Sequence, residues 1–494
     1  MSDLDQVTVV DDYALDVVII GAGFSGIAAG VKLQKEKMNN FIIIEKSNEV
    51  GGVWRENTYP GCECDVPSSI YSYSFAPNPN WSHIFAKQKE IQQYIKDVAR
   101  RFNMDQHILF NTELRQAAWS QQQQAWLIET SNGTYKAKFI FFATGPLSEP
   151  TTPDVIGLDH FQGHIFHSAQ WDHSVDLSNK RVAVIGTGAS AIQIIPAIQP
   201  IVKQLYVFQR TAPWVIPKPN MVINNSSKNV QQKVPFTLNS IRKLTSVSMD
   251  MFSSSVNQPQ TLEVLGKGLI HWMHYQIQDP VLREKVRPKF TLGCKRILFS
   301  NTYYPALAAN NVEVIDQGVK EITPNGILVD GQEVQVDIIV WGTGFEVAKP
   351  PIAKRIITKS GDLLDDVWQE NTVQAFKGCV VKDLPNAFML LGPNSISYNS
   401  LITAAENQID YAIKAIHFVQ DNQLGSFEIS AFAEGQFNQK LQNKLNGTVF
   451  NQGGCASYYL DSKQVNVANY PWTMQYMEND MAEFDSDCYT FASR

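Results

Sequence analysis

Residues Val17-Val18-Ile19-Ile20-Gly21-Ala22-Gly23-Phe24-Ser25-Gly26 decide the fold of this chain. An apolar run enters a GxGxxG pattern, which is typical of a buried strand, a tight turn and a helix N-terminus. A second apolar run, Phe41-Ile42-Ile43-Ile44, ends at Glu45, nineteen residues after Gly26. In such a βαβ unit the glycines let the backbone approach a pyrophosphate, and a carboxylate after the second strand hydrogen-bonds free ribose hydroxyls. The stretch therefore predicts a site for FAD or NAD.

The same pattern occurs a second time and ends in the opposite charge. Val182-Ala183-Val184-Ile185 runs into Gly186-Thr187-Gly188-Ala189-Ser190-Ala191, and Arg210 stands nineteen residues after Ala191. An arginine at this position suits the 2′-phosphate of NADP. One GxGxxG is a weak signal, but two with matched spacing and opposite terminal charge are a strong one. We therefore assign the first pattern to FAD and the second to NADPH.

Length and charge agree with a soluble enzyme, and the length predicts several domains. The chain has 494 residues, a net charge of −7 and a pI near 5.8. This length exceeds one ordinary core, so two or three domains are expected, and the acidic balance argues against a nucleic-acid partner. Residues 1–16 lack the pattern of a signal peptide, and no apolar run approaches the roughly 18 residues that span a bilayer. We expect a cytoplasmic protein without a membrane partner.

The six cysteines are scattered along the chain. They are Cys62, Cys64, Cys294, Cys379, Cys455 and Cys488, and no CxxC or CxxxxC pair occurs among them. This spacing favours neither a redox-active dithiol nor a zinc ribbon, and no metal is expected. A reducing compartment, the cytoplasm, is the default.

The order of the apolar runs predicts an α/β fold with two Rossmann-like dinucleotide-binding domains. Residues 51–65 are rich in glycine and turn formers and are expected to form a loop near the first cofactor. Residues 88–102 have helical periodicity, and residues 117–137 alternate as a β-meander does. Residues 139–145 are a continuous apolar run, which predicts a buried strand of the parallel sheet.

A helical insertion is expected inside the second module. Residues 217–288 are polar and mainly helical in pattern, and they are too many for a loop. A strand at 337–345 closes the second module, while a strand from 388 and a helix at 403–419 belong to the first. We predict an FAD-binding domain of residues 1–146 and 378–494, an NADPH-binding domain of residues 147–216 and 289–377, and a helical insertion of residues 217–288.

The linker that enters the second module carries a family fingerprint. FQGHIFHSAQWD at residues 161–172 resembles the FxGxxxHxxxW(P/D) motif of type I Baeyer–Villiger monooxygenases at every fixed position. Related flavin-containing monooxygenases usually have Tyr or Phe where this chain has Trp171. The resemblance implies a hinge that couples domain motion to the cofactors, with Phe161, Gly163, His167, Trp171 and Asp172 as its fixed residues.

Further stretches resemble the same family. GGVWRENTYPGCECD at residues 51–65 is similar to a GGxWxxxxYPGxxxD segment that lies along the flavin. Lys295-Arg296, followed by Tyr303-Tyr304, is similar to a KR…YY stretch whose arginine sits over the flavin and whose lysine assists 2′-phosphate binding. FQRTAPW at residues 208–214 is similar to the family's FQRTxxW, which adds Thr211 to the 2′-phosphate candidates.

The resemblance implies an NADPH- and dioxygen-dependent flavoprotein that converts ketones to esters or lactones through a C4a-peroxyflavin, with sulfoxidation as a side activity. Arg296 would be the catalytic cation, and Asp65 would hold it in place. The substrate pocket is expected between the flavin, the helical insertion and the loops 392–400 and 453–459. The cofactor-binding candidates are Gly21, Gly23, Phe24, Ser25, Gly26, Glu45, Lys46, Gly52, Val53, Trp54, Asp65, Val66, Tyr71, Gly186, Thr187, Gly188, Ala189, Ser190, Ala191, Arg210, Thr211, Lys295, Arg296 and Asn394.

Three other functions share some of these features. A flavin monooxygenase that oxidises amines or sulfides would have both modules, but Trp171 and the Asp65/Arg296 pair speak against it. A disulfide reductase would need the CxxxxC pair that is missing after the first pattern. A flavin-binding redox sensor without catalysis is the third, and NADPH oxidation that rises with added ketone would separate it from an enzyme.

Overall fold

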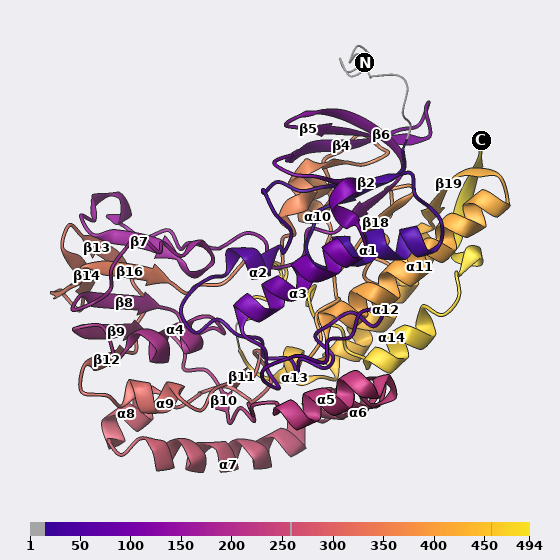
Figure 1. The fold of residues 1–494 in the computed structure, drawn as a ribbon. Coiled ribbons are helices and arrows are strands. Elements are labelled where there is room, and N and C mark those ends of the chain that lie inside the picture. The colour runs from indigo at the N-terminus through magenta and orange to yellow at the C-terminus, as the bar shows by residue number, and fades with distance from the viewer. Residues whose placement is uncertain (1–14, 257–258, 456) are drawn as a thin grey trace.

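The computed structural model describes residues 15–256, 259–455 and 457–494. The acidic residues 1–14, which bear on the signal-peptide prediction, lie outside the described part. Two sheets form the frame, a mixed one in the upper part of Figure 1 and a parallel one at its left, with a group of helices below. Among the described residues, no helix has the length and apolarity to cross a membrane.

The first sheet contains the strand that opens the chain. Its order is β17-β4-β5-β6-β1-β2-β3, and β18 pairs with β6. β1 (Leu15–Ile20) lies parallel to β2 (Phe41–Ile44) and to β6 (Gly133–Phe142), so that Val17 faces Phe41 on one side and Phe139 on the other. The apolar runs are buried on both faces, as central parallel strands require. Helix α1 (Phe24–Lys35) follows β1 directly, which confirms the first strand-turn-helix prediction.

The predicted β-meander is an antiparallel extension of this sheet. β4 (Leu114–Ser120) pairs with β5 (Ala125–Thr130), and β5 pairs with the first half of β6. The second half of β6 joins the parallel part, so one long strand serves both. β3 (Ile108–Leu109) closes the opposite edge after helix α3 (Gln88–Arg101). The prediction of a loop over residues 51–65 is wrong for Val53–Glu56, which form one turn of helix, α2.

The second sheet has the order β12-β9-β8-β16-β7 and is parallel throughout. The second GxGxx(G/A) pattern connects β8 to α4, and the strand predicted at 337–345 is β16. The elements of this module are β7 (His164–His167), β8 (Arg181–Ile185), α4 (Ala191–Ile198), β9 (Gln204–Phe208), α9 (Tyr303–Leu307), β12 (Val312–Ile315), β13 (Glu321–Thr323), β14 (Gly326–Val329), β15 (Gln332–Gln335) and β16 (Ile338–Trp341).

The segment predicted as a helical insertion is helical. A two-stranded pair, β10 (Val215–Ile216) and β11 (Leu298–Phe299), brings its two ends together. Its helices lie at the bottom of Figure 1: α5 (Asn225–Lys233), α6 (Pro235–Val256), α7 (Pro259–Gln276) and α8 (Pro280–Lys285).

The C-terminal part packs on the first module. Helix α11 (Leu401–Asp421) lies alongside α1 in Figure 1, and Lys32 of α1 donates to Asp410 of α11. The remaining elements are α10 (Leu364–Glu370), β18 (Ala387–Met389), β19 (Leu424–Ile429), α12 (Ala431–Asn446), α13 (Val449–Gln452), α14 (Met474–Asp480) and β20 (Tyr489–Ser493).

The chain rejoins the first sheet earlier than residue 378. β17 (Ile356–Ile357) pairs with β4, and Arg355 lies 2.7 Å from Glu113 at the start of that strand. We therefore propose a domain boundary near residue 350 and keep the other predicted boundaries as proposals.

Candidate functional site

The three glycines of the first pattern occupy three different environments. A Cβ on Gly21 would lie 2.8 Å from the carbonyl oxygen of Ala143, and one on Gly26 would lie 1.8 Å from that of Gly21. Gly21 also has a φ of +104°, which favours glycine. A Cβ on Gly23 would meet nothing closer than Gly52, at 3.7 Å. Gly21 and Gly26 are therefore required by packing, whereas Gly23 keeps a space open as the pyrophosphate approach needs.

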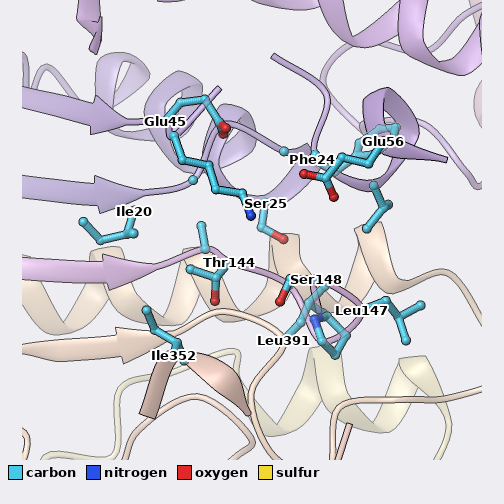
Figure 2. Close-up of a pocket in the computed structure, with 18 of the residues that line it drawn as sticks. Ile20, Phe24, Ser25, Glu45, Glu56, Thr144, Leu147, Ser148, Ile352 and Leu391 are labelled. Carbon is cyan, nitrogen blue, oxygen red and sulfur yellow. The ribbon is translucent and has the colours of Figure 1, made fainter. Parts of the chain in front are cut away.

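That space belongs to a cavity of about 230 Å³, shown in Figure 2. It follows the carboxyl ends of β1, β2 and β6, where open parallel sheets bind nucleotides. The FAD-binding candidates that line it are Gly21, Gly23, Phe24, Ser25, Glu45, Lys46, Gly52, Val53 and Tyr71.

Glu45 stands at the end of β2 as the motif requires, and it is almost fully buried. One carboxylate oxygen accepts from the backbone N–H of Ala22 at 2.8 Å, and the other accepts from the N–H of Ser47 at 2.9 Å. Arg55 of α2, which the motif analysis did not single out, adds a contact at 3.2 Å. Each carboxylate oxygen can accept more than one hydrogen bond, so Glu45 can fix the glycine turn and still receive ribose hydroxyls.

The second pattern repeats this arrangement. A Cβ on Gly186 would lie 2.3 Å from the carbonyl oxygen of Gly342, whereas one on Gly188 would meet nothing closer than 3.9 Å. The third position is Ala191, whose Cβ would lie 3.1 Å from a Cβ placed on Gly342. Because Gly342 has no side chain, Ala191 fits at the third position of the pattern. The space beside Gly188 stays open.

Gly188 faces a second cavity, which has a volume of about 600 Å³ and is larger than the one beside the first pattern. Both modules contribute to its walls. The predicted site residues that line it are Val53, Trp54, Asp65, Val66, Tyr71, Gly186, Thr187, Gly188, Ala189, Ser190, Arg210, Thr211, Lys295 and Arg296. Of the remaining cofactor-binding candidates, Gly26, Ala191 and Asn394 line neither cavity: the first two lie at the helix starts behind the turns, and the Asn394 amide donates to the carbonyl oxygens of Asn466 and Asn469.

The two loops expected to form the substrate pocket line this cavity, whereas the helical insertion does not. Ile396, Ser397 and Asn399 from one expected loop and Tyr458 from the other line it. Among the described residues that line the cavity, none comes from 217–288. The helices of this segment lie outside the cavity, at the bottom of Figure 1, and one residue before them, Lys218, supports the cavity wall from behind.

Lys295 and Arg210 are neighbouring cations in the wall of the cavity that the second pattern lines. Lys295 is half-buried, and burial together with the charge of Arg210 lowers the pKa of its ammonium group. The aliphatic stem of Arg210 runs over Gly318, where a Cβ would lie 2.9 Å from it. Within the described residues neither cation is in an ion pair with a carboxylate. Two neighbouring cations without a counter-charge are suited to a dianion such as a 2′-phosphate.

Asp65 and Arg296, 231 positions apart in the chain, form a bidentate ion pair. Arg296 Nε donates to Asp65 Oδ2 and Arg296 Nη2 donates to Asp65 Oδ1, both at 3.0 Å. Burial alone would raise the pKa of the Asp65 carboxyl, but the charge and hydrogen bonds of Arg296 outweigh it and lower that pKa. The carboxylate in turn raises the pKa of the guanidinium. Arg296 is therefore a fixed, permanently charged cation in the cavity wall.

The loop that carries Asp65 is held by helix α4 of the second module. The Gln193 side chain accepts from Tyr59 Oη at 3.0 Å and donates to the carbonyl oxygen of Glu63 at 3.0 Å. Gly61, at a φ of +83°, lies so close to α4 that a Cβ would be 2.6 Å from the carbonyl oxygen of Gln193. The Pro60-Gly61 turn thus docks one module onto the other.

A buried lysine holds the same loop from the opposite side. Lys218 Nζ lies 2.6 Å from Glu63 Oε1 and donates to the carbonyl oxygen of Cys64 at 2.9 Å. The sequence analysis missed Lys218 and Glu63, because each is an ordinary charged residue when read in isolation.

The fingerprint residues surround β7 and do not line either cavity. A Cβ on Gly163 would lie 2.3 Å from the carbonyl oxygen of Asp337, so the glycine lets the start of β7 approach the residue before β16, the strand with which β7 pairs. Trp171 packs on Phe166, while Phe161 belongs to a core on the far side of the sheet. Asp172 is exposed, and hydrogen bonds from Ser174 lower the pKa of its carboxyl.

His167 connects the fingerprint to the cavity. It is buried at the end of β7, its Nδ1 accepts from the N–H of Ala169, and its ring meets that of Phe345 edge-on at 5.8 Å between centroids. Phe345 lines the cavity. Burial lowers the pKa of the imidazole, so its neutral form is favoured in this contact.

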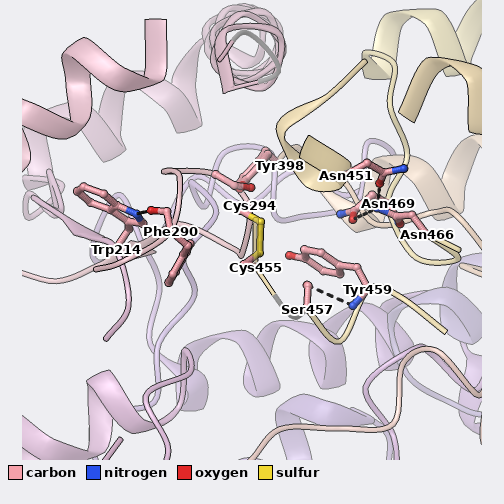
Figure 3. Close-up of a disulfide and its surroundings, with 11 residues drawn as sticks. Trp214, Phe290, Cys294, Tyr398, Asn451, Cys455, Ser457, Tyr459, Asn466 and Asn469 are labelled. Atoms are coloured by element: carbon pink, nitrogen blue, oxygen red, sulfur yellow. Dashed lines mark hydrogen bonds between the residues drawn. A yellow bond between two sulfur atoms is a disulfide. The ribbon is translucent and has the colours of Figure 1, made fainter. Parts of the chain in front are cut away.

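The cysteines are not all free thiols. The sequence analysis took a reducing compartment as the default and named no disulfide, but Cys294 and Cys455 form a disulfide across 161 positions, shown in Figure 3. The bond ties the turn before Lys295 and Arg296 to the loop that carries Tyr458. No local spacing signals it, because the two positions meet through the fold alone.

Comparisons with known proteins agree with this geometry. A family model described as pyridine nucleotide-disulphide oxidoreductase matches residues 18–250, which contain both glycine patterns. Proteins named Baeyer-Villiger monooxygenase from Streptomyces coelicolor and Pseudomonas aeruginosa are 41% and 42% identical to this chain. The matches cover 92% and 90% of this chain and 89% and 85% of those proteins.

Solved structures show the same fold over nearly the whole chain. A steroid monooxygenase bound to NADP has a TM-score of 0.88 at 27% identity, with 98% of this chain and 100% of that chain covered. The cyclohexanone monooxygenase from Rhodococcus sp. Phi1 bound to NADP⁺ has a TM-score of 0.88 at 26% identity, with 97% and 99% covered. The two dinucleotide cradles open on two cavities that share the wall residues Val53, Tyr71 and Leu147. Together with relatives of this similarity, this geometry shows that the chain belongs to the Baeyer–Villiger monooxygenases and is an FAD- and NADPH-dependent oxidoreductase.

Proposed function

We propose that this enzyme converts ketones to esters or lactones in the 600 Å³ cavity, with dioxygen as co-substrate. The observation that carries the proposal is the Arg296–Asp65 pair, which places a fixed guanidinium in the wall between the two cradles. When bound, FAD supplies the oxygen-activating chemistry and NADPH supplies the hydride. The roles below are those of the chain's own residues.

Arg296 is proposed as the catalytic cation. A carbonyl oxygen gains negative charge as its carbon is attacked, and a preorganised guanidinium stabilises that charge without reorganisation. Loss of one such donor costs roughly 3–4 kcal/mol, or about 10²–10³ in rate. Asp65 accepts hydrogen bonds from Nε and Nη2 of Arg296. The Nη1 group of the guanidinium is therefore the donor available to a ligand.

The 2′-phosphate of NADPH is proposed to bind Arg210, Lys295 and Thr211. The two uncompensated cations support this assignment, because an anion relieves their mutual repulsion. Thr187 Oγ1 donates to the carbonyl oxygen of Thr211 at 3.1 Å, which fixes the end of the FQRT segment against the second cradle. Charge selection of NADPH over NADH follows from this pair of cations.

The walls near Arg296 favour apolar ketones. Leu147, Phe345, Val347, Ile396 and Leu401 line the same cavity as the Asp65–Arg296 pair. Apolar surface of this kind binds hydrocarbon skeletons by excluding water, and the single cation selects the carbonyl end. We also propose the cytoplasm as the site of action, on the basis of the four free thiols Cys62, Cys64, Cys379 and Cys488.

The fingerprint is proposed as a hinge. The edge-on contact of His167 with Phe345 supports this role, because a shift of β7 would move a residue of the cavity wall. The fingerprint residues then act through Phe345 and remain positioning residues.

Product analysis of Arg296→Ala tests the proposal. With a panel of apolar ketones, the wild-type enzyme is expected to give an ester or lactone by gas chromatography, with NADPH consumption that rises with ketone. Arg296→Ala should lower ester formation about 10²–10³-fold. Lys203→Ala, an exposed cation after α4, is the matched control. Ester formation by Arg296→Ala at the wild-type rate would remove the catalytic role. No ester from any ketone, together with an N-oxide or sulfoxide when an amine or a thioether is supplied instead, would favour a heteroatom-oxidising enzyme.

A further inference from the structure

We propose that Cys294 and Cys455 are a redox-modifiable site, a clasp on the cavity that peroxide closes and a dithiol reductant opens. The part of this inference that concerns turnover rests on the proposed function. The part that concerns the thiols does not.

The clasp joins the two sides of the cavity. Cys294 is buried and directly precedes Lys295 and Arg296, which line the cavity. Cys455 lies on the C-terminal side, between α13 and Tyr458, which lines the same cavity. Figure 3 shows the bond between these two segments, with Tyr459 and Tyr398 in the same buried cluster.

Gly453 allows the segments that carry Cys294 and Cys455 to approach each other closely. A Cβ on Gly453 would lie 2.4 Å from Cys294 Cβ and 2.7 Å from its sulfur, so only glycine leaves room for the two chains to approach. The N–H of Thr291 donates to the carbonyl oxygen of Gly453 at 3.2 Å and sets the segments side by side. This built contact distinguishes the pair from Cys62, Cys64, Cys379 and Cys488, which are free.

The bond holds the loop next to Tyr458, whose side chain makes a hydrogen bond to the Tyr459 hydroxyl at 3.4 Å and a ring contact with the same residue. Tyr458 is 47% exposed, whereas its neighbour Tyr459 is buried and its carbonyl oxygen accepts from the N–H of Val467. The loop is therefore anchored at Tyr459 on one side of Tyr458 and at Cys455 on the other. Reduction removes the covalent anchor at Cys455 and leaves only the backbone contact of Gly453 with Thr291 on that side of the loop, beside the Arg296 wall.

The two sulfurs differ in access, which sets the direction of exchange. Cys294 is 1% exposed, and Cys455 is half-buried. A reducing thiolate attacks the Cys455 sulfur, the S–S bond breaks, and Cys294 leaves as a thiolate that takes up a proton. A second thiol of the reductant then displaces Cys455, so one dithiol becomes a disulfide and this pair gains two electrons and two protons.

Closure needs a two-electron oxidant, and hydrogen peroxide is the one proposed. A flavoenzyme that passes both electrons of NADPH to dioxygen without consuming ketone releases this product. Attack of the accessible Cys455 thiolate on peroxide gives a sulfenic acid and water, and Cys294 displaces the second water to form the disulfide. Two thiols and one peroxide thus give one disulfide and two waters.

Thiol counting tests the site without any turnover. The holoenzyme is treated with peroxide or with dithiothreitol, unfolded in N-ethylmaleimide and weighed. Six cysteines less one disulfide leave four, so we expect four labels after peroxide and six after dithiothreitol. Cys455→Ser should give five labels in both states, and Cys488→Ser should change from three to five. Six labels in peroxide-treated wild type, or a disulfide between other cysteines, overturns the proposal.

Two further readouts test what the clasp does. Hydrogen–deuterium exchange of residues 449–460 should rise at least threefold on reduction in the wild type and stay unchanged in Cys455→Ser. The ketone KM and the fraction of NADPH lost to peroxide should also change at least threefold on reduction, and Cys488→Ser should behave as wild type. A correct thiol count with no change in exchange or kinetics rejects the clasp. A correct count and exchange with no ester from any ketone rejects the proposed function and leaves the clasp standing.

Discussion

The Lys218 ammonium group lies 2.6 Å from the Glu63 carboxylate and donates to the carbonyl oxygen of Cys64, one residue before Asp65. The lysine is almost fully buried, and its ammonium also stands over the ring of Phe85 at 5.0 Å. Lys218 begins the segment that leads into the helical insertion, whereas Glu63 belongs to the first module. The carboxylate that holds Arg296 is therefore set in place by a residue of a distant segment.

Lys218→Met should weaken both folding and catalysis. The substitution leaves the Cys64 carbonyl and one Glu63 oxygen without their donor, which costs roughly 1–3 kcal/mol in the free energy of unfolding. We expect a lower kcat with a smaller change in the NADPH KM, because Asp65 moves and Arg210 does not. Urea unfolding and steady-state kinetics measure the two effects. Lys218→Arg keeps the charge and should recover part of kcat; an unchanged kcat in Lys218→Met would contradict the positioning role.

Asp65 should contribute stability that depends on pH. Arg296 lowers the pKa of this carboxyl in the folded protein below its ordinary value of 3.8. The unfolded state therefore binds the proton first as pH falls, and the stabilisation is complete above pH 3.8 and disappears as pH falls through the lower folded pKa. The difference in unfolding free energy between wild type and Asp65→Asn should be constant above about pH 5 and shrink below pH 3.8. A difference that grows on acidification would contradict the ion pair.

The local part of the fold was predictable and the contacts between segments were not. The Val17–Gly26 and Val182–Ala191 patterns fix strand, turn and helix through their own backbone needs, and Figure 1 shows both units where they were expected. Asp65 and Arg296 were paired only through the family resemblance. The Cys294–Cys455 bond and the Lys218–Glu63 contact join segments more than 150 positions apart, and no periodicity encodes such a meeting. The short helix α2 was missed because two glycines precede it.

Arg210→Ala should change cofactor preference. Loss of one charge-assisted hydrogen bond to the 2′-phosphate costs roughly 1.5–3 kcal/mol, so the NADPH KM should rise at least about tenfold. NADH has no phosphate there, and its KM should change little. Steady-state kinetics with both cofactors measures the ratio, with Lys203→Ala as the control for loss of a surface charge. An equal rise in both KM values would remove Arg210 from the 2′-phosphate site.

Alanine at Gly23 and alanine at Gly26 should have different effects, the first on FAD binding and the second on folding. At Gly23 the new methyl group enters open space toward the cavity, so Gly23→Ala should fold and yet lose FAD, whose pyrophosphate needs that space. At Gly26 the methyl would lie 1.8 Å from a carbonyl oxygen of the preceding turn, so Gly26→Ala should lose the fold itself. Circular dichroism reports the fold and the ratio of flavin to protein absorbance reports occupancy. Gly188→Ala is the matched control, because its methyl enters the other cradle and should spare FAD while it weakens NADPH binding; a Gly23→Ala protein that keeps full flavin would show that the pyrophosphate lies elsewhere.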